Sequence, residues 1–212
     1  MNGSWLNHNI EMGEYPNYEK FINTIFSLKD RECLEYIIGG IASDWNVLGK
    51  LIILSGPPAS GKSTLLNLIY EIFKGYICCI SQSDLIDIPR PIGAPKLMIM
   101  HDFDPQKVEN DEPFYRLADH SPIILKNRFG HLYYRPCNVT LFAATNSDKE
   151  NKNAIILHTT GKRISPINSF NTCVHNMLEN EIGHIIDHCI KVYRYKTEMF
   201  RLGLIELSGL LR

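Results

Sequence analysis

Residues 50–63 read Lys-Leu-Ile-Ile-Leu-Ser-Gly-Pro-Pro-Ala-Ser-Gly-Lys-Ser, an apolar run followed at once by the pattern GxxxxGK with Ser or Thr after it. A continuous apolar run of this length is typical of a buried parallel strand. The glycines allow the following loop to turn so that its backbone N–H groups face inward, where phosphate oxygens can accept their hydrogen bonds. The stretch therefore predicts a strand, a phosphate-binding loop and a helix in succession.

Each residue type in this loop has a role in holding a nucleoside triphosphate. Lys62 is expected to place its charge on the β- and γ-phosphates, and the Ser63 hydroxyl to ligate Mg²⁺. The helix predicted to begin near Ser63 adds the positive end of its dipole. We expect ATP with Mg²⁺ to be held by Gly56, Pro57, Pro58, Ala59, Ser60, Gly61, Lys62, Ser63 and Thr64. The alternative is a Gly-Pro turn that happens to precede Lys-Ser.

A second apolar run ends in acidic residues, as residues 97–104 read Leu-Met-Ile-Met-His-Asp-Phe-Asp. Enzymes with such loops hold Mg²⁺ with a further carboxylate at the end of a neighbouring strand. Asp102 is the predicted metal ligand, and Asp104 is the nearby alternative. One of the two would belong to the Mg²⁺ shell and the other would polarise the attacking water; alternatively, both are ordinary loop residues.

Two further positions complete the predicted catalytic set. The run over residues 139–144 delivers Asn146 to the end of a strand, where an uncharged amide could orient water against the γ-phosphate. Arg163, in the segment Gly161-Lys162-Arg163, could reach a phosphate bound by a neighbouring subunit and stabilise transition-state charge. The alternative for Lys162 and Arg163 is a basic pair on the surface.

The rest of the chain is expected to build one α/β domain around these sites. Parallel strands are predicted at 50–55, 77–80, 97–100 and 139–144, with helices on both faces of the sheet. A β-hairpin is predicted over 121–136, with its turn near Phe129 and Gly130. The organisation follows as an arm (1–17), a helical lead-in (18–48), the ATPase core (49–170) and C-terminal helices (171–212).

Two helices are expected in the lead-in, because apolar residues recur there at helical spacing. Asp30 is the expected N-cap of the second helix, and the pair Gly39-Gly40 is expected to weaken or end it. Helical spacing is found again over residues 172–210.

Composition narrows the class of protein. The 212 residues carry a formal net charge of −1, which excludes a globally basic nucleic-acid binder but allows a local basic patch. Six cysteines include no CxxC pair, so free thiols in a reducing compartment are expected. The N-terminus resembles no secretory signal, and no apolar run is long enough to cross a bilayer. We therefore expect an intracellular, cytoplasmic protein without a membrane partner.

The order and spacing of these motifs resemble those of superfamily 3 helicases of the AAA+ class, as found in the primase–helicases of phages, satellites and large DNA viruses. The resemblance covers roughly residues 30–195. His101 stands where many members carry an acidic residue, which leaves open how the acidic roles divide between Asp102 and Asp104. The similar segments are the lead helix at 30–40, Walker A at 55–76, Walker B at 98–102, the approach to the hairpin at 121–131, the sensor at 141–146, the finger segment at 162–163 and the closing helix at 178–186.

The resemblance implies a ring, expected to be a hexamer, whose hairpins grip single-stranded or forked DNA in a central channel. Basic groups at Lys126, Arg128 and His131 would contact phosphates, and Tyr133 and Tyr134 could stack on bases. The alternative is an amphipathic hairpin packed on the domain with solvated cations. Origin recognition or priming, if needed, is expected from a separate primase or origin-binding protein.

Two other classes of function remain open. The loop sequence also suits a small-molecule kinase of the nucleotide type, although such enzymes need several arginines converging on the phosphates. A helicase loader or regulatory ATPase that works with a partner would carry the same loop. His184 and His188 share a helix face with Cys189 adjacent, but no HExxH glutamate accompanies them, so a metal site is not expected there.

Overall fold

The computed structural model describes residues 6–43, 51–81, 97–106, 123–126, 130–135, 139–147, 154–162, 168–206 and 209, with only the backbone described for 123–126, 132–135 and 168–170. Arg128, Arg163 and the turn residue Phe129 lie outside these ranges.

Within the described residues, a five-stranded sheet forms the centre of the molecule, and every strand pair described in it is parallel. The strand order is β2-β3-β6-β1-β7, so β6 separates β1 from β3. The fifth strand, β7, was not predicted, although its sequence Ala-Ile-Ile-Leu-His is a short apolar run. The strands are β1 (Leu51–Ser55), β2 (Ile77–Cys79), β3 (Leu97–Met100), β6 (Thr140–Thr145) and β7 (Ala154–His158).

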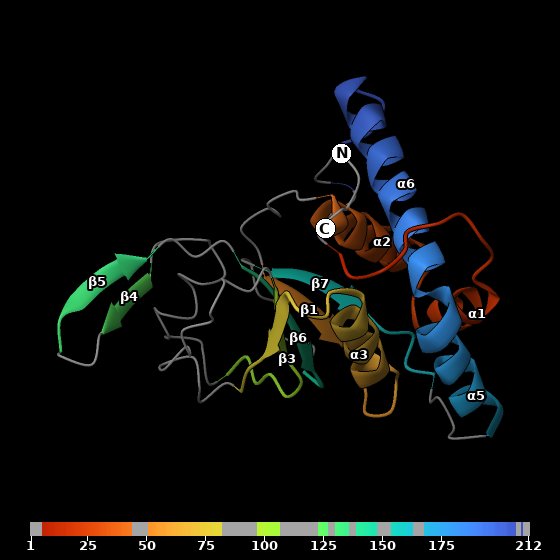
Figure 1. Ribbon diagram of the computed structural model, residues 1–212. Coiled ribbons are helices and arrows are strands. Elements are labelled where there is room, and N and C mark those ends of the chain that lie inside the picture. The colour runs from red at the N-terminus through yellow and green to blue at the C-terminus, as the bar shows by residue number, and fades with distance from the viewer. Residues whose placement is uncertain are drawn as a thin grey trace.

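Helices flank this sheet, so the predicted α/β class is confirmed at that level. They are α1 (Pro16–Ile25), α2 (Leu28–Ala42), α3 (Lys62–Ile72), α5 (Asn168–Asn176), a π-helical turn (Met177–Glu181) and α6 (Ile182–Arg201). Figure 1 shows α1, α2, α5 and α6 gathered on one side, with α6 running along α2.

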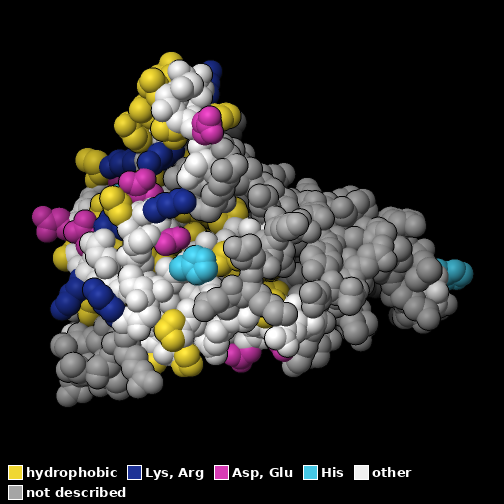
Figure 2. All heavy atoms as spheres, turned by 180° about the vertical axis from the view of Figure 1, so that it is seen from behind, with side chains coloured by type: hydrophobic (Ala, Val, Ile, Leu, Met, Phe, Trp, Pro, Cys, Tyr) yellow, Lys and Arg dark blue, Asp and Glu magenta, His cyan; other side chains and the backbone are white. Residues whose placement is uncertain are grey.

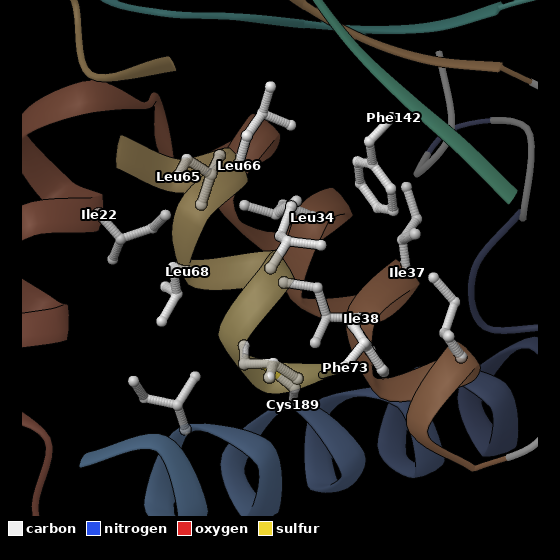
Figure 3. Packing of buried hydrophobic residues seen from close by; sticks show 14 of the residues in the cluster. Ile22, Leu34, Ile37, Ile38, Leu65, Leu66, Leu68, Phe73, Phe142 and Cys189 are labelled. Atoms are coloured by element: carbon white, nitrogen blue, oxygen red, sulfur yellow. The ribbon is translucent and has the colours of Figure 1, made fainter. Parts of the chain in front are cut away.

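The core divides according to the two faces of the sheet, because side chains alternate along each strand. Ile52 and Leu54 of β1 point into a large cluster with Phe142 and the apolar faces of the helices. Figure 3 shows leucines of α3 pointing into the same space as Leu34 and Ile38 of α2. Ile53 faces the opposite way, into a smaller cluster to which no described helix contributes. The expected helices on both faces are therefore not confirmed within the described residues.

The start and the length of α2 differ from the prediction. Ser27, not Asp30, is the N-cap: its Oγ accepts a hydrogen bond from Asp30 N at 3.2 Å and donates one to Asp30 Oδ2 at 2.6 Å. The bond from Asp30 N to Ser27 Oγ is the first half of a capping box, and the Asp30 carboxylate binds the Ser27 hydroxyl where a capping box would bind the backbone N–H. The spacing Ser-x-x-Asp over residues 27–30 is visible in the sequence, and it is the signal that identifies Ser27 as the N-cap.

The pair Gly39-Gly40 does not end α2, which runs on to Ala42. A Cβ on Gly39 would lie only 2.0 Å from the carbonyl oxygen of Cys189 in α6. The missing side chain therefore lets the backbones of the two helices meet. Burial of this contact outweighs the helix-weakening effect of glycine, which is about 1 kcal/mol relative to alanine.

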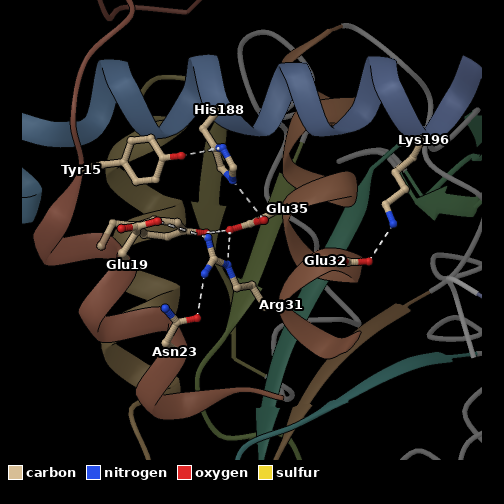
Figure 4. Close-up of polar contacts among 9 residues, drawn as sticks. Tyr15, Glu19, Asn23, Arg31, Glu32, Glu35, His188 and Lys196 are labelled. Atoms are coloured by element: carbon tan, nitrogen blue, oxygen red, sulfur yellow. Dashed lines mark hydrogen bonds and ion pairs between the residues drawn. The ribbon is translucent and has the colours of Figure 1, made fainter. Parts of the chain in front are cut away.

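A buried polar network joins α2 to α1 and α6 (Figure 4). Glu35 is 2% exposed; its Oε1 lies 2.8 Å from Arg31 Nε and its Oε2 lies 3.1 Å from His188 Nε2. The Tyr18 hydroxyl donates to Oε1 at 3.3 Å, and the Tyr15 hydroxyl lies 2.8 Å from His188 Nδ1. Burial raises the pKa of Glu35, but hydrogen bonds from His188 and Arg31 outweigh it and leave the pKa below its ordinary value.

Helix α6 ends at Arg201, so the helical stretch predicted up to residue 210 is interrupted there, and residue 209 is helical again. Gly203 adopts φ 69°, and its N–H donates to Phe200 O while Leu204 N–H donates to Met199 O. This pair of hydrogen bonds is the Schellman arrangement, in which a left-handed glycine closes the last turn.

The predicted hairpin is present as β4 (Ile123–Lys126) and β5 (Leu132–Arg135), paired antiparallel with Lys126 opposite Leu132. Gly130, in its connection, has φ 84°. Figure 1 shows this hairpin standing apart from the five-stranded sheet, on the side away from α6.

The surface carries apolar side chains around the C-terminal end of α6, as Figure 2 shows. Tyr195, Phe200, Leu202 and Leu204 are all exposed there. None of the helices in the described part of the chain combines the length and the apolar character that spanning a bilayer requires.

Candidate functional site

The loop between β1 and α3 turns by means of three residues with positive φ. These are Gly56 (148°), Ala59 (62°) and Gly61 (91°). A left-handed alanine is unfavourable, and such strained residues concentrate where the surrounding structure requires them. Gly61 is the N-cap of α3, which begins at Lys62, and its carbonyl accepts from Leu65 N at 3.0 Å. The helix N-terminus therefore opens directly onto the loop.

Lys62 lies folded against this loop. Its Nζ donates to Gly56 O at 2.6 Å and Pro57 O at 2.8 Å, and it lies 3.4 Å from Ser60 Oγ. Only 8% of the residue is exposed, and burial lowers the pKa of its amine. The charge is thus concentrated at the centre of the loop, where an incoming anion would meet both the ammonium group and the helix N-terminus.

The carboxyl ends of β1 and β6 are tied together beside this loop. Ser55 lies opposite Thr145 in the sheet, and Ser55 Oγ donates to Ser147 O at 2.9 Å. Ser147 N in turn donates to Thr145 Oγ1 at 3.1 Å. The next residue along each strand is Gly56 on β1 and Asn146 on β6, so the exposed Asn146 leaves the sheet next to the loop.

The acidic segment over residues 101–104 lies at the same ends of the strands, on the β3 side of β6. Phe103 N donates to Ala144 O at 2.8 Å, which continues the β3–β6 pairing beyond the strand end. Asp102 is exposed at this point. Asp104 Oδ1 instead accepts a hydrogen bond from Gln106 N at 3.0 Å, which stabilises the turn over residues 104–106. The structure therefore brings the loop, Asn146 and Asp102 to one edge of the sheet.

The oxygen atoms available at this edge suit Mg²⁺. Ser63 is exposed at the start of α3 and offers a hydroxyl, and Asp102 offers an exposed carboxylate. Mg²⁺ commonly takes one or two protein oxygens and completes its shell with water and substrate phosphates. No group of three His, Cys, Asp or Glu side chains capable of holding a metal occurs among the described residues, so a dedicated protein cage for a metal is not found there.

A segment that the sequence did not mark lies against the loop. Thr159 follows β7 directly, and its Oγ1 donates to Ser60 Oγ at 2.9 Å. A Cβ on Gly56 would lie 1.9 Å from Thr159 Oγ1, so the two residues can approach only because Gly56 has no side chain. No local motif identifies Thr159, because its role depends on β7 pairing with β1.

The other predicted residues are only partly placed. Lys162 is exposed in the segment after β7, and its neighbour Arg163 lies outside the described residues. On the hairpin, His131 is exposed beside the connection, the backbone of Lys126 ends β4, and Arg128 lies outside the described residues. Tyr133 and Tyr134 belong to β5, of which the backbone is described.

Neither a protein-family model nor a curated protein matches this chain. Solved structures of the NrS-1 C terminal region are similar to it. The A form apo structure of that region gives a TM-score of 0.66 at 10% identity, over 95% of this chain and 54% of that one. The apo structure of region 305–718 gives a TM-score of 0.64 at 9% identity, over 91% of this chain and 53% of that one. The chain thus shares the fold of this region and spans about half of its length.

Proposed function

We propose that this chain is an ATP hydrolase that binds ATP and Mg²⁺ at the loop over residues 56–63 and couples hydrolysis to movement along DNA, as part of a ring of the superfamily 3 helicase type. The observation that carries the proposal is the convergence of that loop, Asn146 and Asp102 at one edge of the sheet. Ligands of open parallel sheets bind at the carboxyl ends of the strands. The fold shared with the NrS-1 C terminal region supports the architecture on which the proposal depends.

In the proposed binding step, the triphosphate enters the loop and the ammonium group of Lys62 turns from the Gly56 and Pro57 carbonyls to the β- and γ-phosphates. Backbone N–H groups at the start of α3 complete the anion site. Ser63 and Asp102 would hold Mg²⁺, which supplies charge neutralisation on the phosphates when bound. Asp104, whose Oδ1 accepts from Gln106 N, remains the alternative acidic residue.

In the proposed hydrolysis step, Asn146 orients the attacking water in line with the γ-phosphate. The Ser55–Ser147 and Ser147–Thr145 hydrogen bonds hold the residues on both sides of Asn146, so its backbone needs little reorganisation. Arg163 of an adjacent subunit would stabilise the charge that develops in the transition state. Such head-to-tail interfaces close into a ring when the rotation between subunits permits.

The β4–β5 hairpin is the proposed contact with DNA. It stands apart from the sheet (Figure 1), Lys126 ends its first strand, and Arg128 and His131 lie in its connection. Cationic side chains on a projecting hairpin bind phosphates without reading base sequence, as a translocating motor requires. Affinity for single-stranded DNA should therefore fall steeply with salt.

The test is steady-state ATP hydrolysis with and without single-stranded DNA. We expect DNA to stimulate hydrolysis, and Lys62→Ala to abolish it because the charge at the centre of the loop is lost. Lys74→Ala is the matched control, since Lys74 is exposed beyond the other end of α3 and pairs with Glu71 at 3.1 Å. Hydrolysis that DNA does not change would contradict the motor, and phosphate transfer to a small molecule would favour a kinase.

A further inference from the structure

Thr159 is held in place by the sheet on one side of the loop. Its N–H donates to Ser55 O at 2.9 Å, which extends the β1–β7 pairing by one residue, and it forms a bridge with Phe26 beyond the end of α1. The next residue is anchored as well: Thr160 N donates to Ile25 O and Thr160 Oγ1 donates to Thr24 O, both at 2.8 Å. The backbone at 159–160 is therefore fixed between β1 and α1.

From this anchored position the Thr159 side chain reaches into the loop. Its hydroxyl donates to Ser60 Oγ, and Ser60 is 1% exposed. The same Ser60 oxygen lies 3.4 Å from Lys62 Nζ and accepts from it. A chain of polar contacts thus runs from Thr159 through Ser60 to the lysine. At the start of the loop, Gly56 leaves room for this hydroxyl, because a Cβ there would overlap Thr159 Oγ1.

We propose that Thr159 is a positioning residue for the loop over residues 56–63, and that its hydroxyl sets nucleotide affinity by holding Ser60 and, through Ser60, Lys62. The inference rests on the proposed nucleotide binding at this loop. Thr159 itself does not touch the phosphates. It holds the loop in one conformation before binding, so that less conformational entropy is lost when the triphosphate binds.

The test compares Thr159→Val, Thr159→Ser and Thr160→Val in the full chain. Valine keeps the shape of threonine but removes the hydroxyl, so we expect about a 3- to 10-fold weaker Kd for ATP, the size typical of one lost buried hydrogen bond. Serine keeps the hydroxyl and should restore the Kd to within about twofold. Thr160→Val breaks the bond to Thr24 O, away from the loop, and should lower Tm without changing the Kd.

Each quantity is measured on the same preparations: Kd by titration with a fluorescent ATP analogue, KM and kcat by hydrolysis, and Tm by thermal unfolding. For Thr159→Val we expect a raised Kd and KM together with some loss of Tm, whereas Thr160→Val should lower Tm alone. If Thr159→Val binds like the wild type while Lys62→Ala does not bind, the positioning role is wrong and the proposed function stands. Binding that survives Lys62→Ala overturns both. If both Thr159→Val and Thr160→Val lost affinity in proportion to their loss of Tm, the role of Thr159 would be structural alone.

Discussion

Asn146 is the residue whose proposed role depends most on its neighbours in the sheet. It directly follows β6, which lies between the strand leading to the loop and the strand leading to Asp102. Thr145 on one side and Ser147 on the other are both hydrogen-bonded. The backbone that carries the exposed Asn146 amide is thus set before the nucleotide binds, which suits the proposed role in orienting water.

Replacing Asn146 with alanine should therefore separate binding from turnover. We expect Asn146→Ala to retain Kd for ATP within about twofold and to lower kcat by about 10- to 100-fold, because an interaction made only in the transition state is lost. Asn67→Ala, at an exposed position of α3, is the control and should leave both unchanged. A raised KM with normal kcat would instead place Asn146 in ground-state binding.

At the scale of elements, the contact between α2 and α6 depends on Gly39. An alanine there would place its Cβ 2.0 Å from the Cys189 carbonyl oxygen, so the helices would have to separate. We expect Gly39→Ala to lower the free energy of unfolding by about 1–3 kcal/mol, although alanine is the better helix former. Urea denaturation measures this, with Lys20→Ala on the exposed face of α1 as control. A stabilised Gly39→Ala protein would show that the helices do not meet so closely.

The network around Glu35 links the same helices and predicts a dependence of stability on pH. The pKa of Glu35 is lowered in the folded protein, so its contribution is present above the ordinary value of 4.5 and is lost as pH falls through the lower folded value. Glu35→Gln removes the charge and should cost about 3 kcal/mol near pH 7, because Arg31 then lacks its buried partner.

The measurement is the difference in unfolding free energy between wild type and Glu35→Gln as a function of pH. We expect this difference to be constant from pH 7 down to about 5 and to shrink at lower pH. A difference that does not change between pH 7 and 3 would show that the Glu35 charge does not contribute. Carboxylates that do not contact Glu35 titrate equally in both proteins and cancel, so the comparison reports on Glu35 together with the partners that it contacts, Arg31 and His188.

At the scale of the whole molecule, the proposed ring requires one active site to draw on two subunits. Lys62 lies at the centre of the loop of its own subunit, and the finger role of Arg163 has to be tested functionally because Arg163 lies outside the described residues. A composite site predicts that two inactive variants can restore activity when mixed, because one subunit can supply an intact Lys62 and its neighbour an intact Arg163.

Lys62→Ala and Arg163→Ala should each lack turnover alone, the second while still binding ATP. Mixed in equal amounts and allowed to exchange subunits, they should recover about a quarter of the wild-type rate, the fraction of interfaces that combine an intact Lys62 with an intact Arg163. Hydrolysis rates measured across mixing ratios check this. Normal turnover in Arg163→Ala alone, or no recovery in the mixture, would contradict the composite site.

Short-range sequence was enough to predict the elements whose interactions lie within a few residues. The strand, loop and helix around residues 50–73 were predicted because the apolar run, the glycines and Lys62 are adjacent in the chain. The hairpin was predicted for the same reason, since its two arms are joined by a short connection. The cap at Ser27 was equally local, and the prediction missed it by placing the cap at Asp30.

Tertiary structure decided everything that depends on which segments become neighbours. Gly39-Gly40 continues a helix because α6 covers it, and Thr159 contacts Ser60 because β7 pairs with β1, about a hundred positions away in the chain. The order of the strands likewise places Asn146 between the loop and Asp102. Such contacts follow from burial and strand pairing across the whole domain, and a local pattern of residues carries no information about the partner that it will meet.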